Sequence, residues 1–190
     1  LIINKPLNIT TNINTTLNGI NGSEIFLITK SGMNSNISNF NFISYEGTGI
    51  KIENTSNIKL SNNSIKNILD SEYKTEYAKG LKIMPGNGVG ILNSSNIVLE
   101  YNTISSYENG VYLNNSQNIF VNNNILKENN YGINYDYNVS NTKVFNNTIN
   151  ENVGNYTLEV PEGPLGYGIY LNNSGVNASI INNSIINNYI

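Results

Sequence analysis

The sequence contains no cysteine, no tryptophan and no histidine, and its ten basic residues are all lysine. Because cysteine and histidine are the usual ligands of zinc and copper, we expect no metal site and no other cofactor. The missing cysteines also leave the redox compartment open. The net charge of −3, with lysines scattered along the chain, excludes nucleic acid as an expected partner. No run approaches the roughly 18 apolar residues of a membrane span, so none is expected in this segment.

Asparagine and isoleucine are what the chain has in excess, and they recur at a fixed spacing. There are 43 Asn among 190 residues. A bias of the genome toward A and T explains part of that excess but not the spacing. Similar units begin at Gly88, Gly110 and Gly132, and each start lies 22 residues after the previous one. Internal repetition at this period indicates a solenoid.

Each repeat holds pairs of apolar residues that alternate with polar ones, such as Ile50/Ile52 and Ile58/Leu60. This alternation predicts short strands with one buried face, which become stable only when coil stacks on coil. We therefore predict an all-β fold, a parallel β-helix solenoid of about seven coils with ~22 residues per coil. The implied apolar columns are Ile50, Val89, Val111, Ile133 and Ile169, then Leu60, Leu99, Val121, Val144 and Ile180, and finally Phe42, Ile65, Ile104, Leu126, Ile149 and Ile185.

Two spacings exceed the period, from Gly49 to Gly88 and from Gly132 to Gly168. They predict two loop insertions at the same corner of the solenoid, roughly residues 69–87 and 153–167. We treat residues 1–190 as a single β-helix domain. Because both ends of the sequence fall inside a repeat, we expect it to be a segment of a longer protein.

One asparagine recurs two residues before the third apolar column. The set is Asn63, Asn102, Asn124, Asn147 and Asn183. Asparagine tolerates the left-handed conformation that tight turns need. Stacked at the spacing of neighbouring strands, about 4.8 Å, each amide can donate to one copy and accept from the next. We therefore predict a structural role for these asparagines.

The repeat unit, Gly-Ile-x-Leu followed by Asn-x-Ile-x-Leu and Asn-Asn-Ser/Thr-Ile, resembles the right-handed parallel β-helix repeat of the pectin-lyase-like superfamily. Gly168-Ile169-Tyr170-Leu171 is one example of its start. The Asn-rich and Ile-rich version resembles the adhesin-like surface proteins of methanogenic archaea. The resemblance spans nearly the whole chain and implies the right-handed coil. It is specific for architecture only, because the superfamily includes lyases, hydrolases, epimerases, tail spikes and plain adhesins.

The residues that catalysis in such a superfamily would imply are scarce. Lyases of this fold use Arg, Lys or His as a base, often beside an Asp-rich calcium site, but Arg and His are absent and only Asp70 and Asp136 exist. A Lys base stays open. A hydrolase needs two carboxylates about 5–9.5 Å apart. The nearest approach is a column that we interpret as a solvated face: Glu100, Glu108, Glu128, Asp136 and Glu151. We predict no catalytic residue and favour a non-enzyme.

Thirteen tyrosines are the main resource for binding. Tyr112 and Tyr170 lie between inward positions, so their side chains should point outward in one strand column. Tyr131 and Tyr167 precede coil-starting glycines, and Tyr107 is close by. We predict that these five tyrosines bind carbohydrate on one face of the β-helix, because aromatic rings and amides suit sugars. The alternative is that they merely cover loops.

Fourteen Asn-x-Ser/Thr sequons suggest an extracellular glycoprotein, although the repeat itself creates several of them. The leading hypothesis is a non-catalytic adhesin-like protein of the cell surface or extracellular space, with a polysaccharide or cell-surface glycan as partner. Two alternatives stay open. One is a polysaccharide-active enzyme, a lyase, hydrolase or epimerase of the superfamily named above. The other is a purely structural spacer.

Overall fold

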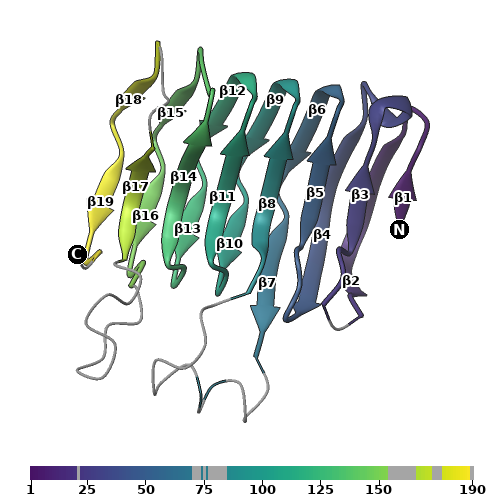
Figure 1. The fold of residues 1–190 in the computed structure, drawn as a ribbon. Coiled ribbons are helices and arrows are strands. Elements are labelled where there is room, and N and C mark those ends of the chain that lie inside the picture. Colours follow the sequence, from purple (N-terminus) through teal and green to yellow (C-terminus); the bar gives the residue numbers. More distant parts are fainter. Residues whose placement is uncertain are drawn as a thin grey trace.

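The computed structural model describes residues 1–20, 22–69, 74, 76, 85–153, 166–172 and 177–188. In this part the chain winds into an elongated solenoid, with its two termini at opposite ends (Figure 1). Its elements there are strands β1 to β19 and the short 3-10 helix η1 at Lys30–Gly32, and the described residues Lys74 and Glu76 are also helical. No helix among these residues is both long and apolar enough to cross a membrane.

One wall of the solenoid is a seven-stranded sheet, called here the first sheet. All its neighbouring strands pair in parallel, as expected when each coil contributes a strand to the same wall. In spatial order its strands are β1 (Ile2–Ile3), β3 (Phe26–Ile28), β5 (Ile50–Glu53), β8 (Asn87–Leu92), β11 (Asn109–Asn114), β14 (Tyr131–Tyr137) and β17 (Tyr167–Leu171).

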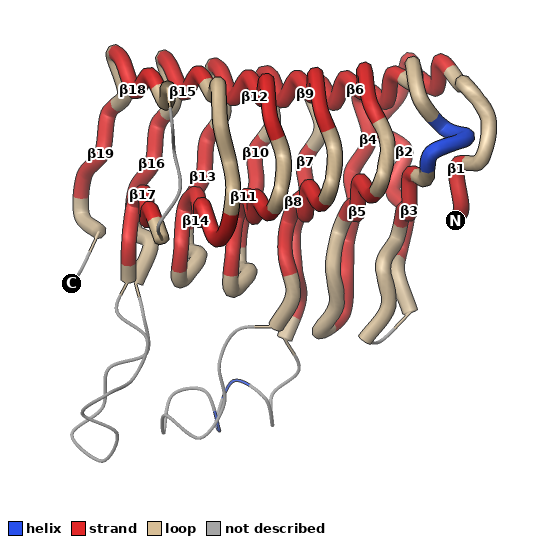
Figure 2. The backbone as a smooth tube through the Cα atoms, turned by 45° about the horizontal axis from the view of Figure 1, so that its top comes forward, coloured by secondary structure: helices blue, strands red, loops and turns tan. Residues whose placement is uncertain are grey.

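The other walls form a twelve-stranded second sheet with two arms that meet at the long strand β4 (Asn36–Tyr45). Strand β4 pairs with both arms and with β2 (Asn8–Asn18). One arm runs through β6 (Ser56–Ser61), β9 (Ser95–Glu100), β12 (Gln117–Asn122), β15 (Lys143–Phe145) and β18 (Ser179–Ile181). The other runs through β7 (Ser64–Ile68), β10 (Thr103–Ser105), β13 (Ile125–Lys127), β16 (Thr148–Asn150) and β19 (Ser184–Ile186). Figure 2 shows these strands stacked coil upon coil.

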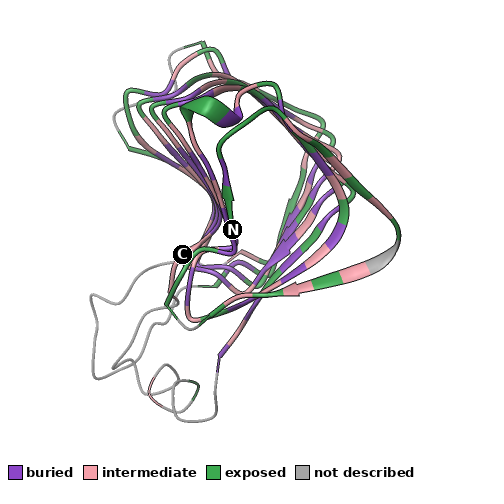
Figure 3. Ribbon diagram, turned by 90° about the vertical axis from the view of Figure 1, so that its right-hand side faces the viewer, coloured by how far each residue is buried: buried purple, intermediate pink, exposed green. Residues whose placement is uncertain are grey.

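The strand register confirms all three predicted apolar columns. Ile50 pairs with Val89 and Val89 with Val111 in the first sheet, and Leu60 pairs with Leu99 in the second. The column side chains are buried in the middle coils, whereas Ile180 and Ile185 in the last described coil are 40% and 45% exposed. Figure 3, which looks along the solenoid, shows buried positions recurring along the stacked walls. Each such side chain stabilises the fold by about 1.5–3 kcal/mol, which is why the apolar periodicity alone specifies the coil.

Most of the two predicted insertions lies outside the described residues, so their loop character stays a prediction. Their predicted edges differ from the structure. Leu69 is buried, with 7% of its surface exposed, and Asn87 and Tyr167 are the first residues of β8 and β17. Asn87 and Tyr167 belong to the coils because they pair in register with Asn109 and Tyr131 of the neighbouring repeats.

The recurring asparagines form a buried ladder along the solenoid. The backbone N–H and the Nδ2 of Asn102 both donate to Oδ1 of Asn124, at 2.9 and 3.0 Å. Asn124 repeats both bonds to Asn147, at 2.9 and 3.1 Å. Asn63 and Asn183 extend the same pattern at its ends. The structural role predicted for this set is therefore confirmed.

The prediction that the ladder asparagines adopt the left-handed conformation is wrong. The left-handed residue is the one before each of them, with φ of 54° at Asn62, 57° at Tyr101 and 56° at Asn123. That residue makes the turn between the two arms of the second sheet, so that the following asparagine can direct its amide into the coil. A second ladder, of Asn129, Asn152 and Asn188 (not predicted), has the same bonding at the next corner.

Candidate functional site

The outer surface of the first sheet gathers four of the five tyrosines predicted to bind carbohydrate. Strand register puts Tyr112 beside Asn134, and Asn134 beside Tyr170, in one outward column. In the neighbouring column Tyr131 pairs with Tyr167. Alternation along the strand points Tyr112, Asn134 and Tyr170 outward while Ile133 and Ile169 face the core. Tyr131 and Tyr167 stand three residues before Asn134 and Tyr170, and the contact of their rings with the Tyr170 ring shows that they share this surface. We call Tyr112, Tyr131, Tyr167 and Tyr170 the tyrosine face.

Three members of the tyrosine face are in direct ring contact. The rings of Tyr131 and Tyr167 are stacked, with centroids 5.4 Å apart and planes 11° from parallel. The Tyr170 ring lies 5.5 Å from Tyr131 and 4.9 Å from Tyr167. All three side chains are half-buried, which leaves part of each ring open to a ligand. Burial raises the pKa of the Tyr131 phenol, and the charges of Tyr167, Glu108 and Tyr170 raise it further, so the phenol stays a neutral donor.

The fourth member, Tyr112, is tied into a polar network. Its hydroxyl donates to Oδ2 of Asp136 at 2.6 Å, and the Nδ2 of Asn114 donates to the same oxygen at 2.8 Å. Nδ2 of Asn172 reaches Oδ1 of Asp136 at 3.4 Å. The Tyr112 bond is the main cause that lowers the pKa of the Asp136 carboxyl, against a smaller opposite effect of burial, and the bonds from Asn114 and Asn172 lower it further. Asp136 is therefore a carboxylate that hydrogen bonds fix in position.

A β-bulge brings Asp136 to this position. Leu113 of β11 pairs with Tyr135 of β14, but the next residue, Asn114, pairs with Tyr137. Two residues of β14 thus oppose one residue of β11, which locally re-aims the side chains of the bulged strand. The carboxylate consequently meets Tyr112 in the coil before it.

A second carboxylate lies next to the tyrosine face. Glu108 directly precedes β11, and its backbone carbonyl accepts the N–H of Tyr131 at 2.8 Å. Its side chain is half-buried, and this burial raises the pKa of the carboxyl. The charge of Glu108 is a smaller cause of the raised pKa of both the Tyr112 and the Tyr131 phenol, after burial.

The prediction that Tyr107 contacts carbohydrate is wrong. Its side chain is fully buried, and its hydroxyl shares a 2.8 Å hydrogen bond with the Ser44 hydroxyl inside the coil. The ring lies beside Gly49 and Gly88, where any side chain would press against it. Its backbone N–H donates to Oδ1 of Asn129, so Tyr107 stands at the end of the second asparagine ladder. Burial strongly raises the pKa of this phenol.

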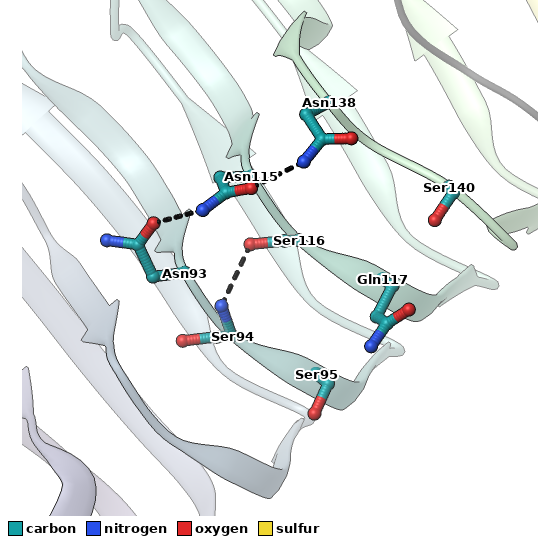
Figure 4. Close-up of a pocket in the computed structure, with 8 residues that line it drawn as sticks. All are labelled: Asn93, Ser94, Ser95, Asn115, Ser116, Gln117, Asn138 and Ser140. Atoms are coloured by element: carbon teal, nitrogen blue, oxygen red, sulfur yellow. Dashed lines mark hydrogen bonds between the residues drawn. The ribbon is translucent and has the colours of Figure 1, made fainter.

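Next to the hydrogen-bond network of Asp136, the corner between the first sheet and the β9–β12 arm forms a polar hollow. Asn115 Nδ2 donates to Asn93 Oδ1 at 2.7 Å, and Asn138 Nδ2 donates to Asn115 Oδ1 at 2.6 Å (Figure 4). The hollow has a volume of ≈ 320 Å³ and is lined by Asn93, Ser94, Ser95, Asn115, Ser116, Gln117, Asn138 and Ser140. Asn115 directly follows Asn114 of the Asp136 network, so the hollow and the tyrosine face are neighbours. Our sequence reasoning missed this site, although its Asn-Ser pairs recur with the repeat.

Comparison with known proteins settles the family. Residues 3–185 match the family described as "Right handed beta helix region". The chain belongs to this right-handed β-helix family. The handedness expected from the repeat is therefore confirmed. No curated protein matches the chain.

One similar solved structure is the A-module of the mannuronan C-5 epimerase AlgE6 of Azotobacter vinelandii. This β-helix is 14% identical to it, with a TM-score of 0.49. The similarity covers 92% of this chain and 54% of that one, so the chain spans about half the length of the epimerase module.

The acidic column predicted from the sequence is not one surface of this β-helix. Glu100 ends β9 in the second sheet and pairs with Lys59 at 2.6 Å, whereas Asp136 belongs to β14 of the first sheet. Glu128 pairs with Lys127 at 3.0 Å. Among the described residues, no three acidic side chains come together as ligands for a metal ion. Of the column, Glu108 and Asp136 adjoin the tyrosine face.

Proposed function

We propose that this β-helix is a non-catalytic glycan-binding module of a cell-surface or extracellular protein, which holds its glycan on the tyrosine face. The observation that carries the proposal is the contact of Tyr131, Tyr167 and Tyr170 on an outer sheet surface. Sugar rings stack their C–H faces on such aromatic rings, and amides and carboxylates beside the rings can bind the hydroxyl groups. Asn114 and Asp136 supply these polar groups next to Tyr112.

The protonation states at the site favour binding over chemistry. Asp136 already accepts hydrogen bonds from Tyr112 and Asn114, and a carboxylate with a lowered pKa is a weak base. Tyr112 has a raised pKa, so its phenol is not readily deprotonated near neutral pH. Both groups are therefore suited to hold a hydroxyl in place.

A specific observation supports a second candidate, the polysaccharide-active enzyme. Burial raises the pKa of Glu108, while hydrogen bonding lowers that of Asp136. Two carboxyl groups whose pKa values are pushed apart are a common arrangement of a general acid and a base. The assay for binding must therefore also score product.

The surface of the coils favours an extracellular location. Ten sequon asparagines among the described residues are solvent-exposed: Asn8, Asn36, Asn54, Asn62, Asn93, Asn138, Asn146, Asn172, Asn177 and Asn182. Exposed sequons are acceptors for glycosylation in a secreted protein. Modification of these residues would be detected as a mass increase that glycosidase treatment removes from protein isolated from its native source.

The experiment is a panel of neutral, acidic and basic polysaccharides, scored for retention of the protein and for release of reducing or unsaturated ends. Replacement of Tyr131 or Tyr170 by Ala removes a stacking surface and should weaken binding roughly 5- to 30-fold. The matched control is Tyr101→Asn, because Tyr101 is 57% exposed but lies at a turn of the second sheet. Its replacement should leave binding unchanged.

The outcomes separate the three candidate functions. Retention without product, lost in the Tyr131 variant and kept in the control, supports the glycan-binding module. Product that disappears on Glu108→Gln or Asp136→Asn would instead establish the enzyme. If the protein neither binds nor converts any polysaccharide, the structural spacer becomes the better account.

A further inference from the structure

The Glu108 side chain is half-buried beside the first sheet. Burial is the cause that raises its pKa, and no lysine among the described residues pairs with it. An unpaired carboxylate that is partly removed from water is costly unless a ligand supplies the missing positive charge. Its position beside Tyr131 and within electrostatic reach of Tyr112 makes the tyrosine face the place where that charge would sit.

In the described strands of the first sheet, no lysine lacks a carboxylate partner. Lys51 is the only lysine in the strands of the first sheet, and its Nζ pairs with Glu53 at 3.2 Å. Two strand steps, through Gly90, separate Lys51 from Tyr112. Asp136 adds a second negative charge to the face. A glycan with carboxylate or sulfate groups would meet repulsion here and gain no ion pair.

The polar groups that the tyrosine face offers to a ligand are hydrogen-bond acceptors, which suit a ligand group that donates. Oδ1 of Asn134, between Tyr112 and Tyr170 in their column, is shielded from solvent and accepts no hydrogen bond. Together with the carboxylates of Glu108 and Asp136, it makes a set of acceptors. An ammonium group has three donors and no acceptor, and it is attracted to the faces of aromatic rings within about 6 Å.

We propose that the tyrosine face selects a glycan built from amino sugars with free, protonated amino groups. The ammonium would lie between the Glu108 carboxylate and the rings of Tyr112 and Tyr131, while the sugar stacks on Tyr167 and Tyr170. This inference rests on the glycan-binding function proposed above and adds the charge of the ligand.

The test uses oligosaccharides of one length: β-1,4-linked glucosamine, its N-acetylated counterpart and galacturonate. Binding of each to the full chain is measured by calorimetry near pH 6, where the amine is largely protonated, at two salt concentrations. We expect glucosamine to bind at least about tenfold more tightly than the acetylated oligomer, with galacturonate weakest. The preference should shrink at high salt, because it is electrostatic.

Two variants make the test specific. Glu108→Gln should remove most of the preference for glucosamine over the acetylated oligomer, because the charge that attracts the ammonium group is lost, and the ratio of the two affinities is the quantity that tests this. The matched control is Glu128→Gln, which removes an exposed carboxylate paired with Lys127 elsewhere on the coil. This control should keep the full preference.

Failure of the inference differs from failure of the proposed function. If the acetylated oligomer or galacturonate binds as tightly as glucosamine, or if Glu108→Gln keeps the preference, the charge argument is wrong while glycan binding stands. If none of the three oligomers binds, and the wider panel also shows no retention, both proposals fall.

Discussion

Replacing Asn124 by Ala is the sharpest test of how the repeat holds together. Oδ1 of Asn124 is the acceptor of the buried Asn102 N–H, and its Nδ2 donates to the carbonyls of Leu99 and Asn122 at 2.9 and 3.0 Å. Removing the side chain leaves the Asn102 N–H without an acceptor in a position that is 1% exposed. A buried unsatisfied group costs about 1–3 kcal/mol, and each further hydrogen bond lost costs about 0.5–1.5 kcal/mol.

We therefore expect Asn124→Ala to lower the free energy of unfolding by about 3–5 kcal/mol. This is a large share of the 5–15 kcal/mol typical of a folded domain. The matched control is Asn122→Ala, two residues earlier, where the side chain is half-buried on the outer side of β12. A surface substitution of this kind changes stability by only about 0.5 kcal/mol.

Urea unfolding followed by far-ultraviolet circular dichroism measures both variants. The midpoint of Asn124→Ala should fall well below that of wild type, while that of Asn122→Ala should stay near it. If the two variants unfold within about 1 kcal/mol of each other, the asparagine ladder is not a major source of stability and the reasoning from buried hydrogen bonds is refuted.

Three further predictions follow from single residues. Tyr107→Phe removes the buried bond to Ser44, so thermal unfolding should show a loss of about 1–2 kcal/mol while calorimetric glycan binding stays unchanged. Tyr101→Asn removes the backbone strain of a bulky residue at φ 57°, so it should raise the free energy of unfolding by roughly 0.5–1 kcal/mol. This would appear as a higher urea midpoint, and a lower midpoint would contradict it. The pKa of Asp136 is lowered in the fold, chiefly by Tyr112, so its contribution is complete above the ordinary carboxyl range and is lost as pH falls through the folded pKa. Melting curves of Asp136→Asn from about pH 6 to pH 2 should lack that acid-side decline, and an unchanged decline would assign it to other groups.

The sequence alone allowed the stacking register of the coils to be predicted, because stacking depends on a pattern that repeats. Alternating apolar residues at a 22-residue period determine which side chain lies above which, and the register of Val89, Val111 and Ile133 follows directly. The same alternation correctly put Tyr112 and Tyr170 on an outer surface. The number of coils stays a prediction.

The sequence did not predict that Tyr107 is buried or that Asp136 contacts Tyr112, and the reasons differ. Tyr107 lies 22 residues before Asn129, so the period itself assigns it to a ladder position, yet its proximity to Gly110 suggested an outward tyrosine. Asp136 meets Tyr112 through a bulge. The position at which a strand accommodates an extra residue depends on local pairing geometry, which a period does not specify.

The departures from the repeat are themselves an argument for where function lies. In one outward column of the first sheet, Asn87 and Asn109 are followed by Tyr131 and Tyr167. Glu108 adjoins Tyr131 through its backbone carbonyl, and the bulge of β14, farther along the same strand, brings Asp136 to Tyr112. Positions that serve only the stack need to keep the same residue type in every coil, because each copy has the same neighbours above and below. The change to tyrosine adds a stacked ring pair between two coils, and it also gathers aromatic rings on one outer face, which is why the proposed ligand site is placed there. The ladder fixes the spacing of the coils, so a glycan held as proposed on the tyrosine face would meet a surface that is already ordered before binding.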